Sequence, residues 1–210
     1  WLDNQSGCKG VCDGLEARDL TRANVPGICA DGYCLDEILS HELEGIAAAG
    51  TGDTVVVLHQ LGNHGPAYHR RYPAAMKRFA PACEKDELRD CSRAEIVNAY
   101  DNALAYTDHF LAGVVRRLDA LRERYDVAMV YASDHGESLG EYGLYLHGTP
   151  NSLAPDVQRD VPFLVWMSDA FARRKAIRAS ELGAEAKHSD ANVFHSIMGA
   201  FDMRSAIYNP

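Results

Sequence analysis

The sequence lacks the long apolar run that crosses a membrane, and it lacks a recognisable secretion signal. No stretch among its 210 residues approaches the ~20 mainly apolar residues that a membrane-spanning helix needs. The chain opens on Trp1, without a methionine or a basic leader segment. We therefore expect a fragment of a longer protein, in which anything that anchors the protein to a membrane lies upstream.

A surplus of positive charge is also missing. The chain has 21 Lys and Arg against 30 Asp and Glu, which gives a net charge of -9. Non-specific binding to DNA or RNA needs a basic face that displaces counterions, so the composition argues against nucleic acid as a partner. An anionic substrate would need bound cations to reverse the local field. The acidic excess equally suits an ordinary solvated surface.

Cysteine is present in an even number, and each cysteine has a near neighbour. The three local pairs are Cys8 with Cys12, Cys29 with Cys34, and Cys83 with Cys91. Local pairs in turn-rich stretches indicate disulfides that close short loops, which form in an oxidising compartment. A thiolate zinc site is the alternative, but its usual pairs have two residues between the cysteines. We therefore expect three disulfides.

Helical periodicity marks three segments, at 35–49, about 92–123 and 193–201. Ser92 followed by Glu95 makes a capping box at the start of the longest segment, and Asp190 stands where it could cap the last one. The apolar positions of the longest segment predict one buried face. Its members are Ile96, Ala99, Ala103, Leu104, Phe110, Leu111, Val114, Val115, Leu118 and Leu121.

Three apolar runs predict buried strands at 54–59, 127–132 and 161–166. A strand, a long helix and a second strand in that order make a βαβ unit. We therefore predict an α/β fold with a mostly parallel central sheet flanked by helices. Ligands of such sheets bind beyond the carboxyl ends of the strands, so the residues that follow each strand are candidates for a functional site.

A histidine followed by glycine occurs after two of these strands and once more downstream. The histidines are His64, His135 and His147, and Asp134 directly precedes the second. Glycine lets the backbone turn sharply, which presents each imidazole at a rim. Imidazole and carboxylate together suit Zn²⁺, so these residues predict one or two metal ions that clamp a phosphoryl group. The alternative is a set of glycine turns whose histidines bond only to backbone.

Other polar residues are weaker candidates. Glu137 could contact substrate, act as an acid or base, or orient a ligand histidine, and it equally suits a surface carboxylate. His59 ends the first strand as either a buried histidine or a substrate contact. Lys9, in the loop of the first cysteine pair, either meets a phosphate or stays solvated. We treat the remaining histidines as structural, apart from a possible outer contact at His188; they are His41, His69, His109 and His195.

Four segments carry a resemblance to a known family. They are 59–68 (HQLGNHGPAY), 99–104 (AYDNAL), 133–140 (SDHGESLG) and 145–148 (YLHG). In this order they closely resemble the phosphoethanolamine–lipid A transferases, which include the mobile colistin resistance enzymes and belong to the alkaline phosphatase superfamily. The resemblance begins at 3–11 and extends to near the C-terminus.

The resemblance implies a role for each residue of the site. Asp134 and His135 would bind zinc together with a glutamate and a threonine nucleophile. His64 and His147 would bind a second zinc or the phosphate of the phosphorylated threonine. Lys9 and Gln5 match positions that contact the transferred phosphoethanolamine, with Gln5 standing where relatives often carry asparagine.

The resemblance also implies partners and a location. Phosphatidylethanolamine would be the donor and a lipid A phosphate the acceptor, and the modification would confer resistance to polymyxin and colistin. The enzyme, a monomer, would lie at the periplasmic face of the Gram-negative inner membrane. Another acceptor (lipopolysaccharide core, a glucan or a protein) and a non-catalytic zinc-binding module are the alternative functions.

The family's glutamate ligand, threonine nucleophile and membrane region have no counterpart here. Thr54 opens a strand, Thr107 lies within a helix, and Thr149 follows the His147 turn, so none replaces the nucleophile. We interpret 1–210 as part of a periplasmic, sulfatase-like catalytic domain whose nucleophile segment lies upstream. We expect the 210-residue chain alone to be inactive as a transferase, and turnover of a phosphatidylethanolamine analogue would contradict this.

Overall fold

Short strands, 3₁₀ turns and helices make up the described part of the computed structural model, which comprises residues 1–5, 7–150, 152–178, 180, 182 and 189–208. The chain divides into two units. The first consists of Trp1–Arg117 and Glu137–Leu146, and the second consists of Leu118–Gly136 and His147–Pro210. Within the described residues, no helix combines the length and the apolar content needed to span a bilayer.

A parallel sheet lies in the first unit. Its central strand, β1 (Leu2–Asp3), pairs with β2 (Arg18–Asp19) on one side and with β5 (Leu58–His59) on the other. The register places Asp3 opposite His59. The predicted α/β class with a parallel sheet is therefore confirmed.

The strand predicted at 54–59 is shorter than the sequence pattern indicated. Only Leu58–His59 forms β5, and Val55 is 49% exposed, so the prediction of a buried strand is wrong for the first part of the run. Its neighbour β1 is two residues long and reaches only as far as the carbonyl of Val57. Among the described residues, 54–56 therefore has no strand to pair with.

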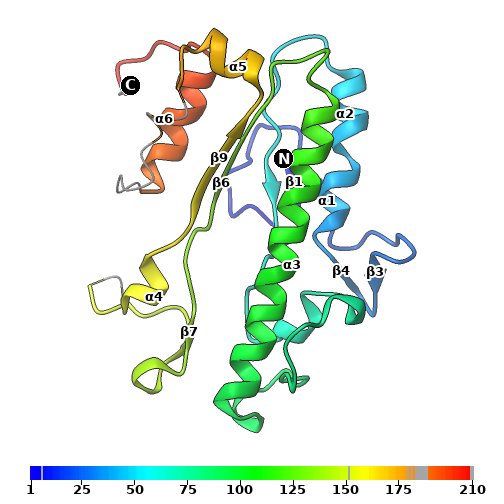
Figure 1. The fold of residues 1–210 in the computed structure, drawn as a ribbon, viewed down its shortest axis with the longest axis vertical. Helices are drawn as coiled ribbons and strands as arrows, with labels where there is room; N and C mark the ends of the chain where they lie inside the picture. Colours follow the sequence, from blue (N-terminus) through cyan, green and yellow to red (C-terminus); the bar gives the residue numbers. More distant parts are fainter. Residues whose placement is uncertain (6, 151, 179, 181, 183–188, 209–210) are drawn as a thin grey trace. The chain divides into compact units, whose positions relative to one another are not determined.

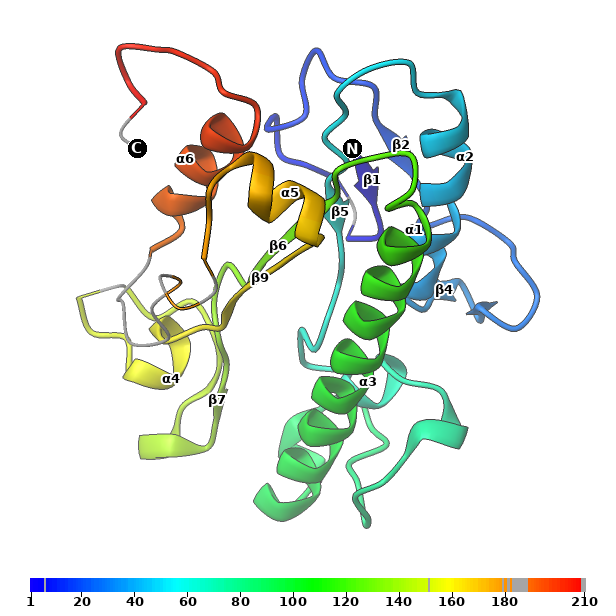
Figure 2. The same cartoon turned by 45° about the horizontal axis from the view of Figure 1, so that its top comes forward.

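Three helices pack in the first unit. The segment predicted at 35–49 divides at Glu42 into α1 (Glu37–His41) and α2 (Leu43–Ala49). Both lie beside the long α3 (Arg93–Ala120), as Figures 1 and 2 show. Ion pairs join them, with His109 Nε2 3.4 Å from Glu37 Oε1 and Arg117 Nη1 2.6 Å from Glu44 Oε1.

The capping box at the start of α3 is confirmed. The Ser92 amide donates to Glu95 Oε2 at 2.8 Å, and the Glu95 amide donates to Ser92 Oγ at 3.3 Å. Leu104 was expected on the buried face but is 46% exposed. It lies about 100° around the helix from the buried Ala103, outside the stripe that faces the unit. The buried positions are Ile96, Ala99, Asn102, Ala103, Tyr106, Thr107, Phe110 and Val114.

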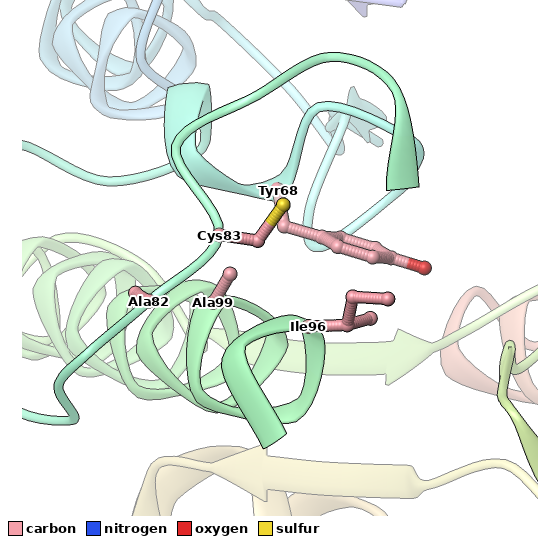
Figure 3. Packing of buried hydrophobic residues seen from close by; sticks show 5 residues of the cluster. All are labelled: Tyr68, Ala82, Cys83, Ile96 and Ala99. Carbon is pink, nitrogen blue, oxygen red and sulfur yellow. The ribbon is translucent and has the colours of Figure 1, made fainter. Parts of the chain in front are cut away.

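Loop residues complete the core against α3. In Figure 3, Tyr68 and Cys83 lie over Ile96 and Ala99 of the helix. Tyr68 opens the 3₁₀ turn η1 (Tyr68–Arg70) and is 1% exposed. Cys83 is bonded to Cys91, and the other two predicted disulfides, Cys8–Cys12 and Cys29–Cys34, also form. The disulfide prediction is confirmed.

Several short elements complete the first unit. Two antiparallel pairs of strands form in this unit. One lies within the Cys29–Cys34 loop, and the other lies in the last segment of the unit, Glu137–Leu146. These elements are β3 (Cys29–Ala30), β4 (Tyr33–Cys34), η2 (Ala74–Met76), η3 (Leu88–Asp90), β7 (Ser138–Leu139), η4 (Glu141–Gly143) and β8 (Tyr145–Leu146).

The second unit contains a two-stranded antiparallel sheet, in which β6 (Ala128–Ala132) pairs with β9 (Phe163–Met167). The predicted strands at 127–132 and 161–166 are thus present, shifted by one or two residues, but they pair antiparallel with each other, so the expected parallel pairing is found for β1, β2 and β5 and not for these two strands. The last predicted helix is present as α6, but Asp190 makes no capping hydrogen bond, so that part of the prediction is wrong. Asn192 Oδ1 instead accepts from the Ser189 amide at 2.8 Å. The helices of this unit are α4 (Asp156–Arg159), α5 (Asp169–Arg174) and α6 (Ala191–Ala200).

Asn102, which is fully buried on α3, fixes the loop that crosses the helix. Its Oδ1 accepts from the amides of Arg78 (2.7 Å) and Phe79 (2.8 Å), and its Nδ2 donates to the Phe79 carbonyl at 2.9 Å. Asn102→Ala should lower the free energy of unfolding by about 2–4 kcal/mol, because partly buried amides lose their acceptor. Urea titration of the protein measures this.

Asn98→Ala on the same helix is the matched control, because it removes a single bond, from Nδ2 to the Pro81 carbonyl (2.7 Å), at an exposed position. We expect a loss of about 1 kcal/mol or less. Equal losses in the two variants would contradict the role assigned to Asn102.

Candidate metal centre

The segment after β6 presents a carboxylate and an imidazole side by side. The Ser133 hydroxyl donates to the His135 carbonyl at 2.8 Å, and the His135 amide donates to Asp134 Oδ1 at 3.1 Å. The Asp134 side chain is 76% exposed, and its Oδ1 lies 3.9 Å from His135 Nε2. The predicted pair therefore projects from a turn that its own backbone contacts stabilise.

His147 lies against His135. The two rings are stacked at 26°, with centroids 3.9 Å apart, and a ligand nitrogen of one lies within 4.8 Å of a ligand nitrogen of the other. Together with Asp134, the second unit thus gathers two imidazoles and a carboxylate. Nitrogen and oxygen donors of these types are the ones that bind Zn²⁺, so the donor set fits the implied metal.

A contact of the same kind orients two of the histidines. Nδ1 of His135 lies 3.0 Å from the carbonyl oxygen of Gly136, and Nδ1 of His64, in the first unit, lies 2.7 Å from that of Gly65. Only a protonated nitrogen donates to a carbonyl, so the contacts assign the ring proton to Nδ1. Nε2 is then the nitrogen whose lone pair suits a metal.

Gly136 is required by close approach of the chain to itself. Its amide donates to the Gln158 carbonyl at 3.0 Å, and a Cβ at this position would stand 2.1 Å from the carbonyl oxygen of Val157. The expectation that glycine serves the sharp turn is therefore incomplete here. The residue lets α4 press against the backbone directly after His135.

Glu137 lies inside the first unit. It is 6% exposed, its Oε1 accepts from the Gly65 amide at 2.9 Å, and its Oε2 accepts a short bond from the Tyr68 hydroxyl. Burial and the neighbouring carboxylate raise the pKa of Tyr68, so its phenol stays protonated and donates. Of the interpretations of Glu137, an exposed surface carboxylate is wrong. The carboxylate fixes the loop directly after His64.

His59 is oriented by a residue that the sequence pattern did not single out. Its Nδ1 lies 2.5 Å from Asp3 Oδ1, while Asp3 Oδ2 accepts from the Gly7 amide at 2.5 Å. Asp3 is 4% exposed and ends β1, directly opposite His59 in the register. The rule that polar residues at strand ends form sites would have identified Asp3, had the two-residue strand been recognisable.

Gln5 and Lys9, which the resemblance matches to contacts with phosphoethanolamine, closely follow Asp3 in the sequence. Gln5 is half-buried, and its Nε2 donates to the Gln60 carbonyl at 3.2 Å. Lys9 is exposed and adopts a positive φ of 49° in the loop that the Cys8–Cys12 disulfide closes. Its ammonium group is thus presented to solvent by a constrained loop.

The histidines treated as structural have ordinary surroundings. His69 is partly buried, which lowers the pKa of its imidazole, and it lies 3.7 Å from Asp86. His109 contacts α1, and His195 packs against Phe194. His41 ends α1 at an exposed position, and His188 lies outside the described residues.

Comparison with known proteins shows the family of this chain. The family model described as Sulfatase matches residues 1–203. The chain is 41% identical to the phosphoethanolamine transferase EptA of Salmonella typhimurium, over 99% of this chain and 39% of that protein. It is 46% identical to the phosphatidylethanolamine transferase Mcr-1 of Escherichia coli, over 79% of this chain and 32% of that protein.

A solved structure gives the same result. The integral membrane protein lipooligosaccharide phosphoethanolamine transferase A of Neisseria meningitidis superposes with a TM-score of 0.94 at 39% identity, covering all of this chain and 40% of that one. The chain thus spans about two fifths of the length of these relatives. It belongs to the sulfatase family and has the alkaline-phosphatase-like fold, and its homologues in that family are phosphoethanolamine transferases.

Proposed function

We propose that this chain is part of a zinc-dependent enzyme that transfers phosphoethanolamine from phosphatidylethanolamine to the phosphates of lipid A. The observation that carries the proposal is the grouping of Asp134, His135 and His147 in a chain whose homologues are phosphoethanolamine transferases. His64 joins this set on the resemblance of its segment to the same family. The four residues hold one or two zinc ions.

The proposed reaction has two displacements. A threonine hydroxyl supplied upstream attacks the phosphorus of the donor, the bond to diacylglycerol breaks, and diacylglycerol leaves with a proton. A phosphate oxygen of lipid A then attacks the phosphorus of the phosphothreonine, and the threonine oxygen leaves and recovers a proton. When bound, zinc would lower the pKa of the attacking hydroxyl and offset charge on the phosphoryl oxygens.

The residues of this chain bind and orient in that scheme. Asp134 and His135 hold the metal, and the Nδ1 contact of His135 with Gly136 directs Nε2 toward it. Lys9 supplies a fixed positive charge to the phosphate, and Gln5 and His59 contact the headgroup. Since the chain has a net charge of -9, the positive charge of Lys9 and that of the metal would make the site acceptable to an anionic substrate.

We place the enzyme, as a monomer, at the periplasmic face of the inner membrane, with a membrane-spanning region and the nucleophile segment upstream of this chain. Three disulfides support an oxidising compartment. The integral membrane relative from Neisseria meningitidis supports the anchor. Masking lipid A phosphates with a cationic group would reduce the binding of polymyxin and colistin, so resistance would follow.

Loss of a metal ligand should abolish the modification. Asp134→Ala, His135→Ala, His147→Ala and His64→Ala should each reduce transfer by at least about 100-fold, because a protein ligand of the ion that drives the chemistry is removed. The measurements are mass spectrometry of lipid A from cells that produce the whole protein and the zinc content of the purified protein.

His109→Ala is the matched control, because this histidine pairs with Glu37 on the helical side of the first unit. It should leave zinc content and lipid A modification unchanged. Full activity in the ligand variants would contradict the assigned metal ligands, whereas zinc binding by the intact protein with no transfer of phosphoethanolamine to any acceptor would support a non-catalytic zinc-binding module. If lipid A stays unmodified in cells that make the intact protein and phosphoethanolamine is found on core sugar, glucan or protein, the acceptor is that molecule and not lipid A.

Lys9→Met should lower kcat/KM for the donor by roughly 10-fold to 100-fold. A cation aimed at a phosphoryl oxygen stabilises charge that develops in the transition state, and the exposure of Lys9 keeps the effect below that of an enclosed group. Turnover of a phosphatidylethanolamine analogue by the whole protein measures it. Lys85→Met removes a surface lysine bonded to the Asp90 carbonyl and should change nothing; equal losses in both variants would count against a specific role for Lys9.

A further inference from the structure

The loop that carries His64 depends on side chains for its position. It runs from Leu61 to Gly65 after β5, and within it the His64 amide donates to the Leu61 carbonyl at a long 3.3 Å. Glu137 holds its far end through the Gly65 amide. The near end and the His64 carbonyl are held by two further charged residues.

Asp36 holds the near end of the loop. Its carboxylate accepts from the amides of Leu61 at 3.0 Å and Gly62 at 2.7 Å, and from Asn4 Nδ2 at 2.8 Å. Asp36 directly precedes α1 but makes no capping hydrogen bond to that helix. A side chain in the usual place for a helix cap therefore binds the loop that carries His64, Leu61–Gly65, which we call the histidine loop.

Arg71 holds the loop at the histidine itself. Its Nε donates to the His64 carbonyl at 2.8 Å. Arg71 and the buried Asp36 also line one small cavity together with Leu61, Gly62 and Arg70, so the half-buried guanidinium of Arg71 and the carboxyl group of Asp36 lie at the same cavity. Burial lowers the pKa of Arg71 and raises the pKa of Asp36, and the attraction between the two groups opposes both shifts.

We propose that Arg71 is a positioning residue for His64, and that Asp36 serves it by anchoring the preceding amides and balancing its charge. The bond to the His64 carbonyl fixes the peptide from which the imidazole projects. The Nδ1 contact with the Gly65 carbonyl then fixes the ring on that peptide. The metal-binding part of this inference rests on the proposed function, in which His64 is a zinc ligand.

The test compares Arg71→Met with Arg71→Lys and with a matched control, Arg70→Met. Arg70 is the adjacent arginine and lines the same cavity, but its guanidinium pairs with Asp86 at 2.6 Å and lies over the Tyr33 ring, and within the described residues it makes no hydrogen bond to the histidine loop. Two quantities are measured on the whole protein. They are amide hydrogen exchange of 58–68 after removal of metal, and the zinc Kd by competition with a chelator.

Arg71→Met should speed exchange in this segment by about 10-fold or more and should weaken zinc binding by about 10-fold to 100-fold, the usual cost of losing a residue that orients a ligand. Arg71→Lys keeps the charge without the planar fork, so both effects should be smaller but present. Arg70→Met should match the original protein in both. A merely structural role would lower the unfolding midpoint without a selective loss of zinc affinity.

Unchanged exchange and unchanged zinc affinity in Arg71→Met, or equal effects from Arg70→Met, would overturn the inference. If Arg71→Met does not fold, Arg71→Lys decides, and values equal to those of the original protein would overturn it. Failure of the proposed function is distinct. An original protein that binds no zinc removes that function, whereas the exchange comparison still decides whether Arg71 fixes the loop.

Discussion

The first unit depends on hydrogen bonds that backbone amides donate to buried carboxylates. A carboxylate removed from water must regain its hydrogen bonds within the protein, and Asp36 and Glu137 do so by binding the amides at either end of one loop. That loop has little regular structure of its own, because the strand before it is two residues long. Side-chain acceptors therefore replace the sheet ladder that usually positions a residue at a strand end.

Regular secondary structure is also short in other parts of the chain. Outside the three main helices of the first unit, most elements span two or three residues, and three disulfides close the loops between them. A disulfide limits the freedom of the unfolded chain and so compensates for a small ladder of hydrogen bonds. Asn4 connects a disulfide-closed loop with a buried carboxylate, since its Nδ2 donates to both the Cys34 carbonyl and Asp36.

Local sequence signals predicted local structure well. The capping box of Ser92 and Glu95, the periodicity of α3 and the pairing of near-neighbour cysteines all depend on residues within a few positions of one another. The repeated histidine–glycine pattern likewise identified His135 and His147, which lie together. The failures have the opposite character. Nothing near 54–56 in the sequence shows that β1 is too short to pair with it.

The supporting residues were missed for the same reason. Asp3 meets His59 across 56 positions, and Asp36 meets Leu61 across 25, so neither partnership leaves a pattern in a local window. Tyr68 lies in the segment 59–68 that carries the family resemblance, but its bond to Glu137 spans 69 positions. Sequence reasoning can therefore nominate the groups that do chemistry, while the groups that hold them in place depend on the tertiary fold.

The packing of Gly136 has a consequence for how this protein can change over generations. A single methyl group at that position would overlap the Val157 carbonyl, so every amino acid that a point mutation can introduce displaces α4 or the turn beside His135. Selection therefore has no gradual route through this position. An inhibitor whose affinity came from the backbone around Gly136 would keep its binding surface in any variant that still folds, which makes escape by substitution there improbable on steric grounds alone.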